Sequence, residues 1–213
     1  NLIIFGQGSM RCHPFAFKEI EIGTIDDPKI AMNALDKVIF AHVGYLLSNT
    51  VRAFWRGLTK GRWVKTPPST LSSYYQSISR LSSAFSLSAE IAMMVLGGSL
   101  KRKERLSARL GDVMSYLYMA SATIKYFEHH GEKDSERPLA EWALQYSIFK
   151  AQEALYELYA NFSVRSLGCL MRAICFPFGR SYKKPNDKID SQVVEVMESD
   201  NPLRDRFVNY FGF

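Results

Sequence analysis

Three glutamates, Glu19, Glu90 and Glu153, carry carboxylates that could in principle act as general bases and abstract a proton from a substrate. Nothing in their spacing distinguishes them from ordinary surface acids or acids held in ion pairs. The sequence therefore assigns no catalytic residue.

Two glycine-containing segments are candidates for a loop that binds the phosphates of a cofactor. Gly6-Gln7-Gly8 lacks a third glycine and a preceding strand, and Gly97-Gly98-Ser99 lacks a following Gly-Lys-Ser/Thr. Both segments are more typical of positions where helices pack or kink. We therefore expect no cofactor-binding residues in this chain.

Cysteines and histidines are the usual zinc ligands, and here they are few and scattered. They are Cys12, Cys169, Cys175, His13, His42 and the pair His129-His130. No Cys-x-x-Cys or histidine-rich spacing occurs, and three cysteines cannot all pair with one another. The sequence predicts spare thiols and no metal site.

A run of basic residues is the strongest candidate for a functional surface in this sequence. Its members, called here the basic cluster, are Lys101, Arg102, Lys103, Arg105 and Arg109. We expect Ser99 to cap a new helix, which would place these cations in its first turns. There the helix dipole disfavours positive charge by about 0.3–1 kcal/mol per residue, so a compensating anion is expected.

Three kinds of anion could compensate the basic cluster. They are acidic side chains of the same protein or a partner subunit, an anionic membrane surface, and a nucleic acid or other polyanion. The net charge of +6 is concentrated nearby, because the window from residue 60 to residue 110 holds nine basic and two acidic residues. A solvated or internally paired surface is the simplest interpretation.

Apolar residues recur with a helical period along almost the whole chain, and no alternating run of β-branched residues occurs. Proline, glycine and capping residues divide the pattern into segments. The expected helices cover about 28–60, 69–96, 99–130 and 164–175, with another that opens at Pro138 and stays in phase through Phe149, and two short ones follow Asp187, separated by Asn201-Pro202. Residues 131–137 read as a surface loop. The sequence thus predicts an all-α fold, a bundle of long antiparallel helices.

The longest dense apolar stretch runs from Leu167 to Phe178 and is interrupted by Gly168, Arg172 and Pro177. It is shorter than the roughly 20 residues that span a bilayer, so we expect no membrane-spanning segment. The first residues include no initiator methionine and no signal-peptide pattern. We expect the chain to be part of a longer protein.

Four strings, in order and at similar spacing, resemble the long bacterial acyl-CoA dehydrogenases of fatty-acid β-oxidation. They are FGQGSMRCHP at 5–14, LGGSLKRKERLSARLGD at 96–112, FPFGR at 176–180 and PNDKID at 185–190. The second string is long and irregular enough to be specific, whereas the short proline and glycine strings alone are weak. Together they extend the resemblance over nearly all of the chain, as the C-terminal helical region of such an enzyme.

The resemblance implies that residues 1–22 end the catalytic helical bundle and that residues 23–213 form an additional C-terminal α-helical domain. In this family the catalytic glutamate lies shortly before the first string, so the base and most of the FAD site would precede Asn1. The chain alone would then be inactive. Gln7, Arg11 and His13 match the family string, and hydrogen bonding at a helix end is a simpler role for them than substrate contact.

The resemblance further implies an enzyme that converts fatty acyl-CoA to trans-2-enoyl-CoA and passes electrons to an acceptor. We expect the remainder of the dehydrogenase as partner, a homodimer, and no nucleic acid. The expected location is the bacterial cytoplasm, with peripheral contact at the inner membrane as a further option. The alternative is a non-enzymatic basic α-helical module that binds anionic lipid or nucleic acid.

Overall fold

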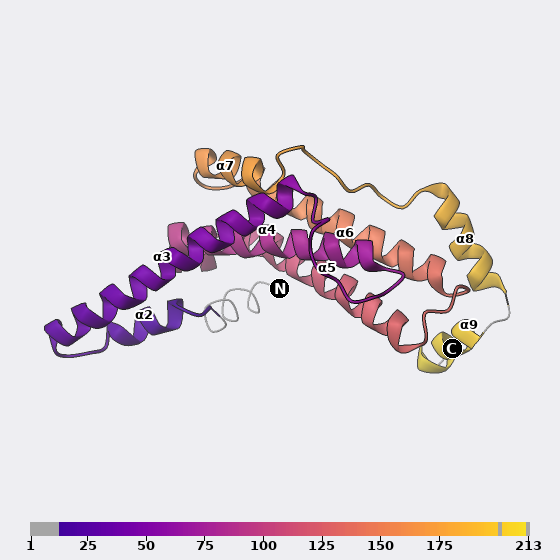
Figure 1. Cartoon of the computed structure of the whole chain (residues 1–213), viewed down its shortest axis with the longest axis horizontal. Coiled ribbons are helices and arrows are strands. Elements are labelled where there is room, and N and C mark those ends of the chain that lie inside the picture. The colour runs from indigo at the N-terminus through magenta and orange to yellow at the C-terminus, as the bar shows by residue number, and fades with distance from the viewer. Residues whose placement is uncertain (1–12, 200–201, 212–213) are drawn as a thin grey trace.

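The structure is a computed structural model that describes residues 13–199 and 202–211, and all of its regular elements are helices (Figure 1). This confirms the predicted all-α fold for the described part of the chain. The elements are α2 (Ala16–Ile22), α3 (Pro28–Leu58), α4 (Ser72–Leu96), η1 (Gly97–Arg102), α5 (Glu104–His129), α6 (Arg137–Ala160), α7 (Arg165–Cys175), α8 (Asp187–Glu198) and α9 (Pro202–Phe211).

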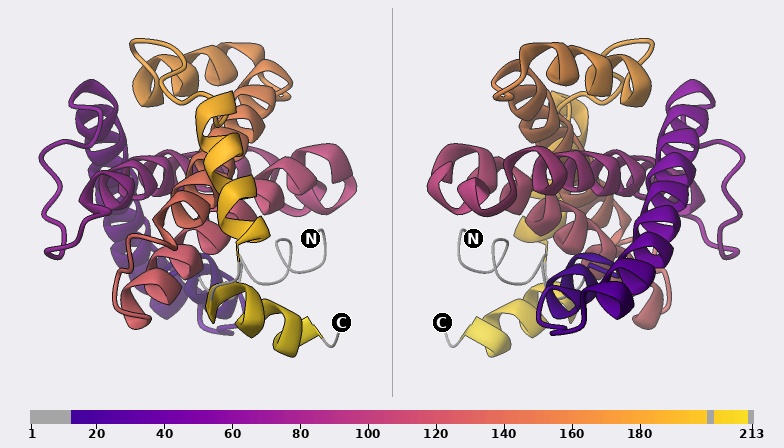
Figure 2. Two further views of the ribbon diagram at one scale, coloured as in Figure 1. Left: turned by 90° about the vertical axis from the view of Figure 1, so that its right-hand side faces the viewer. Right: turned by 90° about the vertical axis from the view of Figure 1, so that its left-hand side faces the viewer.

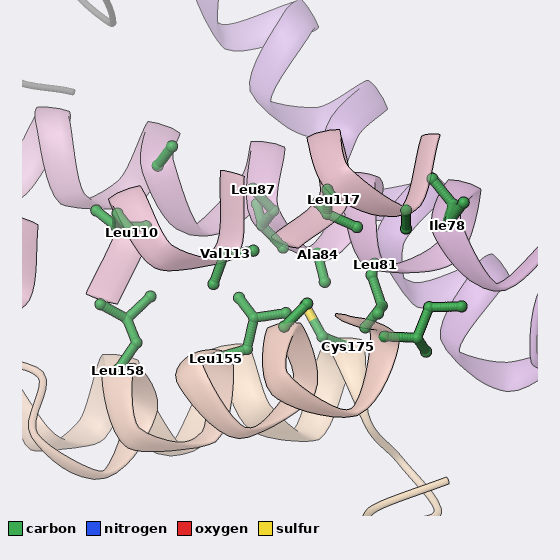
Figure 3. Close-up of a cluster of buried hydrophobic side chains, with 14 of the residues drawn as sticks. Ile78, Leu81, Ala84, Leu87, Leu110, Val113, Leu117, Leu155, Leu158 and Cys175 are labelled. Carbon is green, nitrogen blue, oxygen red and sulfur yellow. The ribbon is translucent and has the colours of Figure 1, made fainter. Parts of the chain in front are cut away.

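Helices α4, α5 and α6 form the body of the protein, and α7 packs over one end of it (Figures 1 and 2). Their apolar stripes meet in one core, where leucines from three helices interdigitate (Figure 3). Leu87, Leu110 and Leu155 are fully buried there. Each buried leucine removes apolar surface from water, which stabilises the fold by about 1.5–3 kcal/mol per side chain.

Several predicted helix boundaries are confirmed, each at a capping residue, proline or glycine. Asp27 caps α3 by accepting hydrogen bonds from the backbone N–H groups of Lys29 and Ile30, with Pro28 at the first helical position. Gly97, with φ of +47°, ends α4 at the predicted break. Pro138 lies in the first turn of α6.

The predicted cap at Ser99 is wrong. Residues 97–102 form the 3₁₀ helix η1 instead, and the Ser99 hydroxyl donates to the Leu96 carbonyl behind it. Helix α5 begins at Glu104, after Lys103. The basic cluster is therefore divided: Lys101 and Arg102 precede α5, Lys103 stands at its N-cap, and only Arg105 and Arg109 lie within its first two turns.

Helix α3 runs along one side of the body and extends beyond it together with α2 (Figure 1). Its exposed side chains include many large apolar ones, with a few polar ones among them; the apolar ones are Ile30, Met32, Ile39, Phe40, Val43, Leu47, Val51, Phe54, Trp55 and Leu58. We call this surface the α3 apolar face. So many large apolar side chains exposed on one helix are typical of an interaction site.

Two helical segments, Pro28–Leu58 and Ser72–Leu100, are long and apolar enough to cross a membrane by length and composition. Neither contains the densest apolar stretch, Leu167 to Phe178, so the expectation of no membrane-spanning segment did not take them into account. The second contains α4, a core helix of the body, which explains its apolar composition without a bilayer. The first coincides with α3, whose described side chains include the α3 apolar face.

Gly168 lets α7 approach α6 closely. A Cβ atom at this position would lie 2.3 Å from the Tyr159 carbonyl oxygen, which belongs to the backbone of α6 and cannot move aside easily. We expect Gly168→Ala to force the two helices apart and to lower the free energy of unfolding by about 1–3 kcal/mol. Urea denaturation of the purified chain measures this.

Gly44→Ala on α3 is the matched control, because a Cβ atom there meets nothing within 4 Å. Alanine is the better helix former, so this change should raise stability by up to about 1 kcal/mol. Equal effects of the two substitutions would contradict the tight α6–α7 contact.

Candidate functional site: a histidine–glutamate cluster and the basic cluster

Four ionisable side chains that lie far apart in the sequence meet where α2, α3 and α4 come together. We call His13, Glu19, His42 and Glu90 the histidine–glutamate cluster. Glu90 lies on α4 and is 2% exposed, while His42 on α3 hydrogen-bonds both Glu90 and Glu19, the latter on α2. His13 precedes α2 and completes the cluster through Glu90.

The hydrogen bonds of His13 define which of its nitrogens carries the proton. Nδ1 accepts from the backbone N–H groups of Phe15 at 3.2 Å and Ala16 at 3.0 Å, so Nδ1 has a free lone pair. Nε2 must therefore hold the proton that it donates to Glu90 Oε2 at 2.7 Å. His13 thus satisfies the first backbone donors of α2, which confirms its predicted role at a helix end; Gln7 and Arg11 lie outside the described residues.

His42 is held between two carboxylates. Nδ1 lies 2.6 Å from Glu19 Oε1, and Nε2 makes a short hydrogen bond to Glu90 Oε1. A carboxylate accepts but does not donate, so both nitrogens must be protonated for both bonds to form. Burial lowers the pKa of His42, but the hydrogen bonds and charges of Glu90 and Glu19 outweigh it, and the pKa is raised above its ordinary value.

Aromatic rings cover the cluster and limit the access of water. Phe15 stacks on the His42 ring with centroids 5.2 Å apart, and Tyr45 lies 5.6 Å from Phe15 and 5.9 Å from His13. A low-dielectric surrounding strengthens each charged hydrogen bond. The cluster therefore ties α2 and the segment before it to α3 and α4 by electrostatics rather than by apolar burial, since no residue of α2 is buried.

His13, His42 and Glu90 each offer a ligand atom, and these atoms lie within 4.8 Å of one another, which is compatible with a metal ion. A histidine that binds metal through Nε2 normally donates a proton from Nδ1 to a neighbouring acceptor. Nδ1 of His13 instead accepts from two backbone donors. Metal binding at Nε2 while Nδ1 keeps these bonds would require the ring to lose its one N–H proton and become an imidazolate, so the cluster is better explained by hydrogen bonding than by a bound metal ion.

Four members of the basic cluster, Arg102, Lys103, Arg105 and Arg109, line a shallow hollow of about 450 Å³ together with Glu104, Asn161 and Ser163. Arg109 pairs with Glu157 on α6, with 3.4 Å between Nε and Oε2. Arg102, Lys103 and Arg105 are exposed and form no ion pair among the described residues. Internal pairing thus accounts for one cation, while the side chain of Lys101 is not among those described.

The remaining sequence candidates have ordinary surroundings. Glu153 pairs with Arg180, with 3.0 Å between Oε1 and Nε. Cys169 and Cys175 are free thiols, as expected, and burial raises the pKa of Cys175 to about 11; Cys12 lies outside the described residues. Sequence reasoning named Glu19, Glu90, His13 and His42 singly and missed that they form one cluster, because their separations of 23 to 77 residues leave no local pattern.

Residues 10–212 match the protein family described as acyl-CoA dehydrogenase, C-terminal, bacterial type. The match covers nearly the whole chain and both clusters, and it confirms the resemblance drawn from the four sequence strings. No solved structure matches the fold significantly.

The raised pKa of His42 predicts a pH-dependent stability. A group whose pKa is higher in the folded state stabilises the fold fully below its unfolded value, about 6.5, and loses that contribution as pH rises through the folded value. His42→Gln should therefore lower the free energy of unfolding most near about pH 6 and progressively less toward about pH 9. Urea denaturation at a series of pH values measures the difference.

His129→Gln provides the control, because His129 is exposed at the C-terminal end of α5, away from both carboxylates. A His42→Gln effect that stays constant across the pH range would show that the cluster is held by shape alone, without the charge on His42.

Proposed function

Because the chain belongs to the bacterial-type acyl-CoA dehydrogenase C-terminal family, we propose that it is the C-terminal part of an FAD-dependent enzyme that oxidises fatty acyl-CoA to trans-2-enoyl-CoA. This reaction is the first step of fatty-acid β-oxidation. The match over residues 10–212 is the observation that carries the proposal.

The reaction needs a carboxylate placed over the substrate α-carbon and a flavin that takes the β-hydrogen as hydride. Within the described residues, each of the three candidate glutamates already has a cationic or histidine partner: Glu19 and Glu90 face His42, and Glu153 faces Arg180. These residues do not fit an FAD site or a free base. On this proposal the catalytic glutamate and the flavin are held by other parts of the dehydrogenase.

The role proposed for the present chain is that of a scaffold. The α3 apolar face is the surface best suited to pack against the remainder of the dehydrogenase, because its exposed side chains run the length of a 31-residue helix. The histidine–glutamate cluster holds α2, which precedes α3 in the chain, and would fix the position of the segment that leads into the α3 apolar face. Homodimer formation is part of the same proposal.

Leu47→Asp in the whole dehydrogenase tests the scaffold role. Leu47 is 60% exposed in the centre of the α3 apolar face, and a charge there would lose its hydration when the surface packs against another part of the enzyme. A penalty of about 2 kcal/mol or more reduces correct assembly over tenfold, so bound flavin and acyl-CoA oxidation should both fall. Flavin absorbance per protein and a dehydrogenase assay measure this.

The neighbouring Ser48→Asp is the matched control, because Ser48 is exposed on the same helix and already polar. It should leave flavin content and activity unchanged, and the 213-residue chain alone should show neither. Normal activity of the Leu47→Asp enzyme would exclude the α3 apolar face as an assembly surface, while flavin bound by the isolated chain would contradict the assignment of the cofactor to other residues.

Peripheral attachment to the bacterial inner membrane is a second function that one observation favours. Arg102, Lys103 and Arg105 are exposed together at one end of the body and lack acidic partners among the described residues. Each cation near an anionic bilayer contributes about 1 kcal/mol of binding. A protein that lies at the membrane from the cytoplasmic side is consistent with this surface, and nucleic acid is not required to explain it.

Replacing Arg102, Lys103 and Arg105 with glutamine should weaken binding to phosphatidylserine or phosphatidylglycerol vesicles by about 100-fold, since about 3 kcal/mol is lost. Vesicle co-sedimentation measures this. The control replaces Lys29, Lys37 and Arg52 on α3, which removes the same charge from another exposed surface. If both triple variants lose the same vesicle affinity, binding depends on net charge and not on this surface. If the unmodified protein does not bind the vesicles, the membrane role is refuted.

A further inference from the structure

Arg80 on α4 is a buried cation for which the described part of the chain offers no anionic partner. Its side chain belongs to a residue that is 2% exposed, and none of its three guanidinium nitrogens has a hydrogen-bond partner among the described residues. Buried charges are normally paired, and each exception calls for a physical explanation. Two aromatic rings adjoin the guanidinium: the centroid of Phe176 lies 5.2 Å from it and that of Tyr182 lies 5.5 Å from it.

The two rings offset part of the charge but leave the donors unsatisfied. The face of an aromatic ring attracts a cation, yet it accepts only weak hydrogen bonds. A guanidinium has five N–H donors that match the oxygens of a carboxylate or phosphate. The positive charge of Arg80 therefore remains largely uncompensated.

The loop that carries both rings is held firmly in place. Gln152 on α6 is fully buried; its Oε1 accepts from the backbone N–H groups of Ser181 at 2.8 Å and Tyr182 at 3.0 Å, and its Nε2 donates to the Tyr182 carbonyl at 2.9 Å. Gly179, at φ of +75°, makes the turn between the two rings. The loop is therefore part of the rigid body and positions its side chains reproducibly.

A pocket of about 700 Å³ lies next to this loop and is lined by arginines. Arg172 from α7 and Arg180 from the loop line it together with Tyr156 and Phe176, so Phe176 separates the pocket from Arg80. The Tyr156 hydroxyl is buried and has no hydrogen-bond partner among the described residues.

Positive charge exceeds negative charge around this hydroxyl. Burial raises the pKa of Tyr156, whereas Arg180, Arg172 and Arg80 act in the opposite direction, so all three cations are close enough to affect it. Glu153 is the acid that acts on the same hydroxyl, and it pairs with Arg180.

We propose that this pocket is a binding site for an oxyanion, a phosphate or carboxylate group of a ligand. Arg172, Arg180 and the Tyr156 hydroxyl would donate hydrogen bonds to its oxygens, and Arg80 would add attraction from behind Phe176 through its charge. The site lies on α6, α7 and the loop at 176–182, and it involves no member of the basic cluster or the histidine–glutamate cluster. It does not depend on the proposed enzymatic function.

Titration of the 213-residue chain with inorganic phosphate and, separately, with acetate at constant ionic strength tests this proposal and distinguishes the two oxyanions. Isothermal calorimetry should show saturable binding of at least one of them, with Kd near or below about 1 mM. Arg172→Gln and Tyr156→Phe should each raise that Kd about tenfold, because each removes one hydrogen bond to a charged group. Arg105→Gln in the basic cluster is the control and should leave it unchanged.

Arg80→Met tests whether the charge of Arg80 contributes to ligand binding or only to the stability of the fold. Methionine has a similar length and no charge, so without phosphate or acetate the melting temperature should stay equal or rise, because an uncompensated charge is removed. The Kd for the anion should rise several-fold. A lower melting temperature together with an unchanged Kd would make Arg80 a purely structural residue and overturn its part in the site.

The Arg172→Gln and Tyr156→Phe variants test the anion site independently of whether Arg80→Met folds. An unchanged Kd in both Arg172→Gln and Tyr156→Phe, binding that Arg105→Gln abolishes, or absence of saturable binding for both anions would each overturn the proposal.

Discussion

The arrangement of the helices depends on charge that is buried in α4. Glu90 and Arg80 both lie on this core helix, both are 2% exposed, and an unpaired charge at such a position costs several kcal/mol. Each therefore constrains what surrounds it. Glu90 forms hydrogen bonds with two histidines from other segments. Arg80 contacts two aromatic rings, both from the segment that follows α7. Glu90 thus helps to fix α2, which has no buried residue, whereas Arg80 lies beside Phe176, itself a member of the apolar core.

This constraint is clearest at α2, a helix of 7 residues none of which is buried. A helix so short is not stable by itself, and apolar burial contributes little here. The hydrogen bond from His42 to Glu19 holds it against α3, and the hydrogen bond from His13 to Glu90 ties the residues before it to α4. The position of α2, and of whatever the chain connects to it, therefore depends on the protonation of His42.

Sequence reasoning succeeded where local chemistry decides the structure. Asp27-Pro28 starts a helix and Gly97 ends one because capping and backbone freedom act within a few residues. The histidine–glutamate cluster could not be predicted in this way, because His13 and Glu90 are 77 residues apart and only the packing of α3 on α4 brings them together. Arg80 was equally hidden: in the sequence it is one more cation in a basic window, and only the fold shows that it is buried.

The wrong prediction at Ser99 has a physical explanation that also clarifies the basic cluster. A helix beginning at Ser99 would have placed Lys101, Arg102 and Lys103 against the positive end of its dipole. The chain instead forms η1 over these residues and starts α5 at Glu104, whose carboxylate suits a first turn. Only Arg105 remains in the disfavoured first turn, and Arg109 is relieved by Glu157. The conflict that suggested a compensating anion is thereby largely resolved by the backbone, and what remains is a surface of exposed cations free to meet an external one.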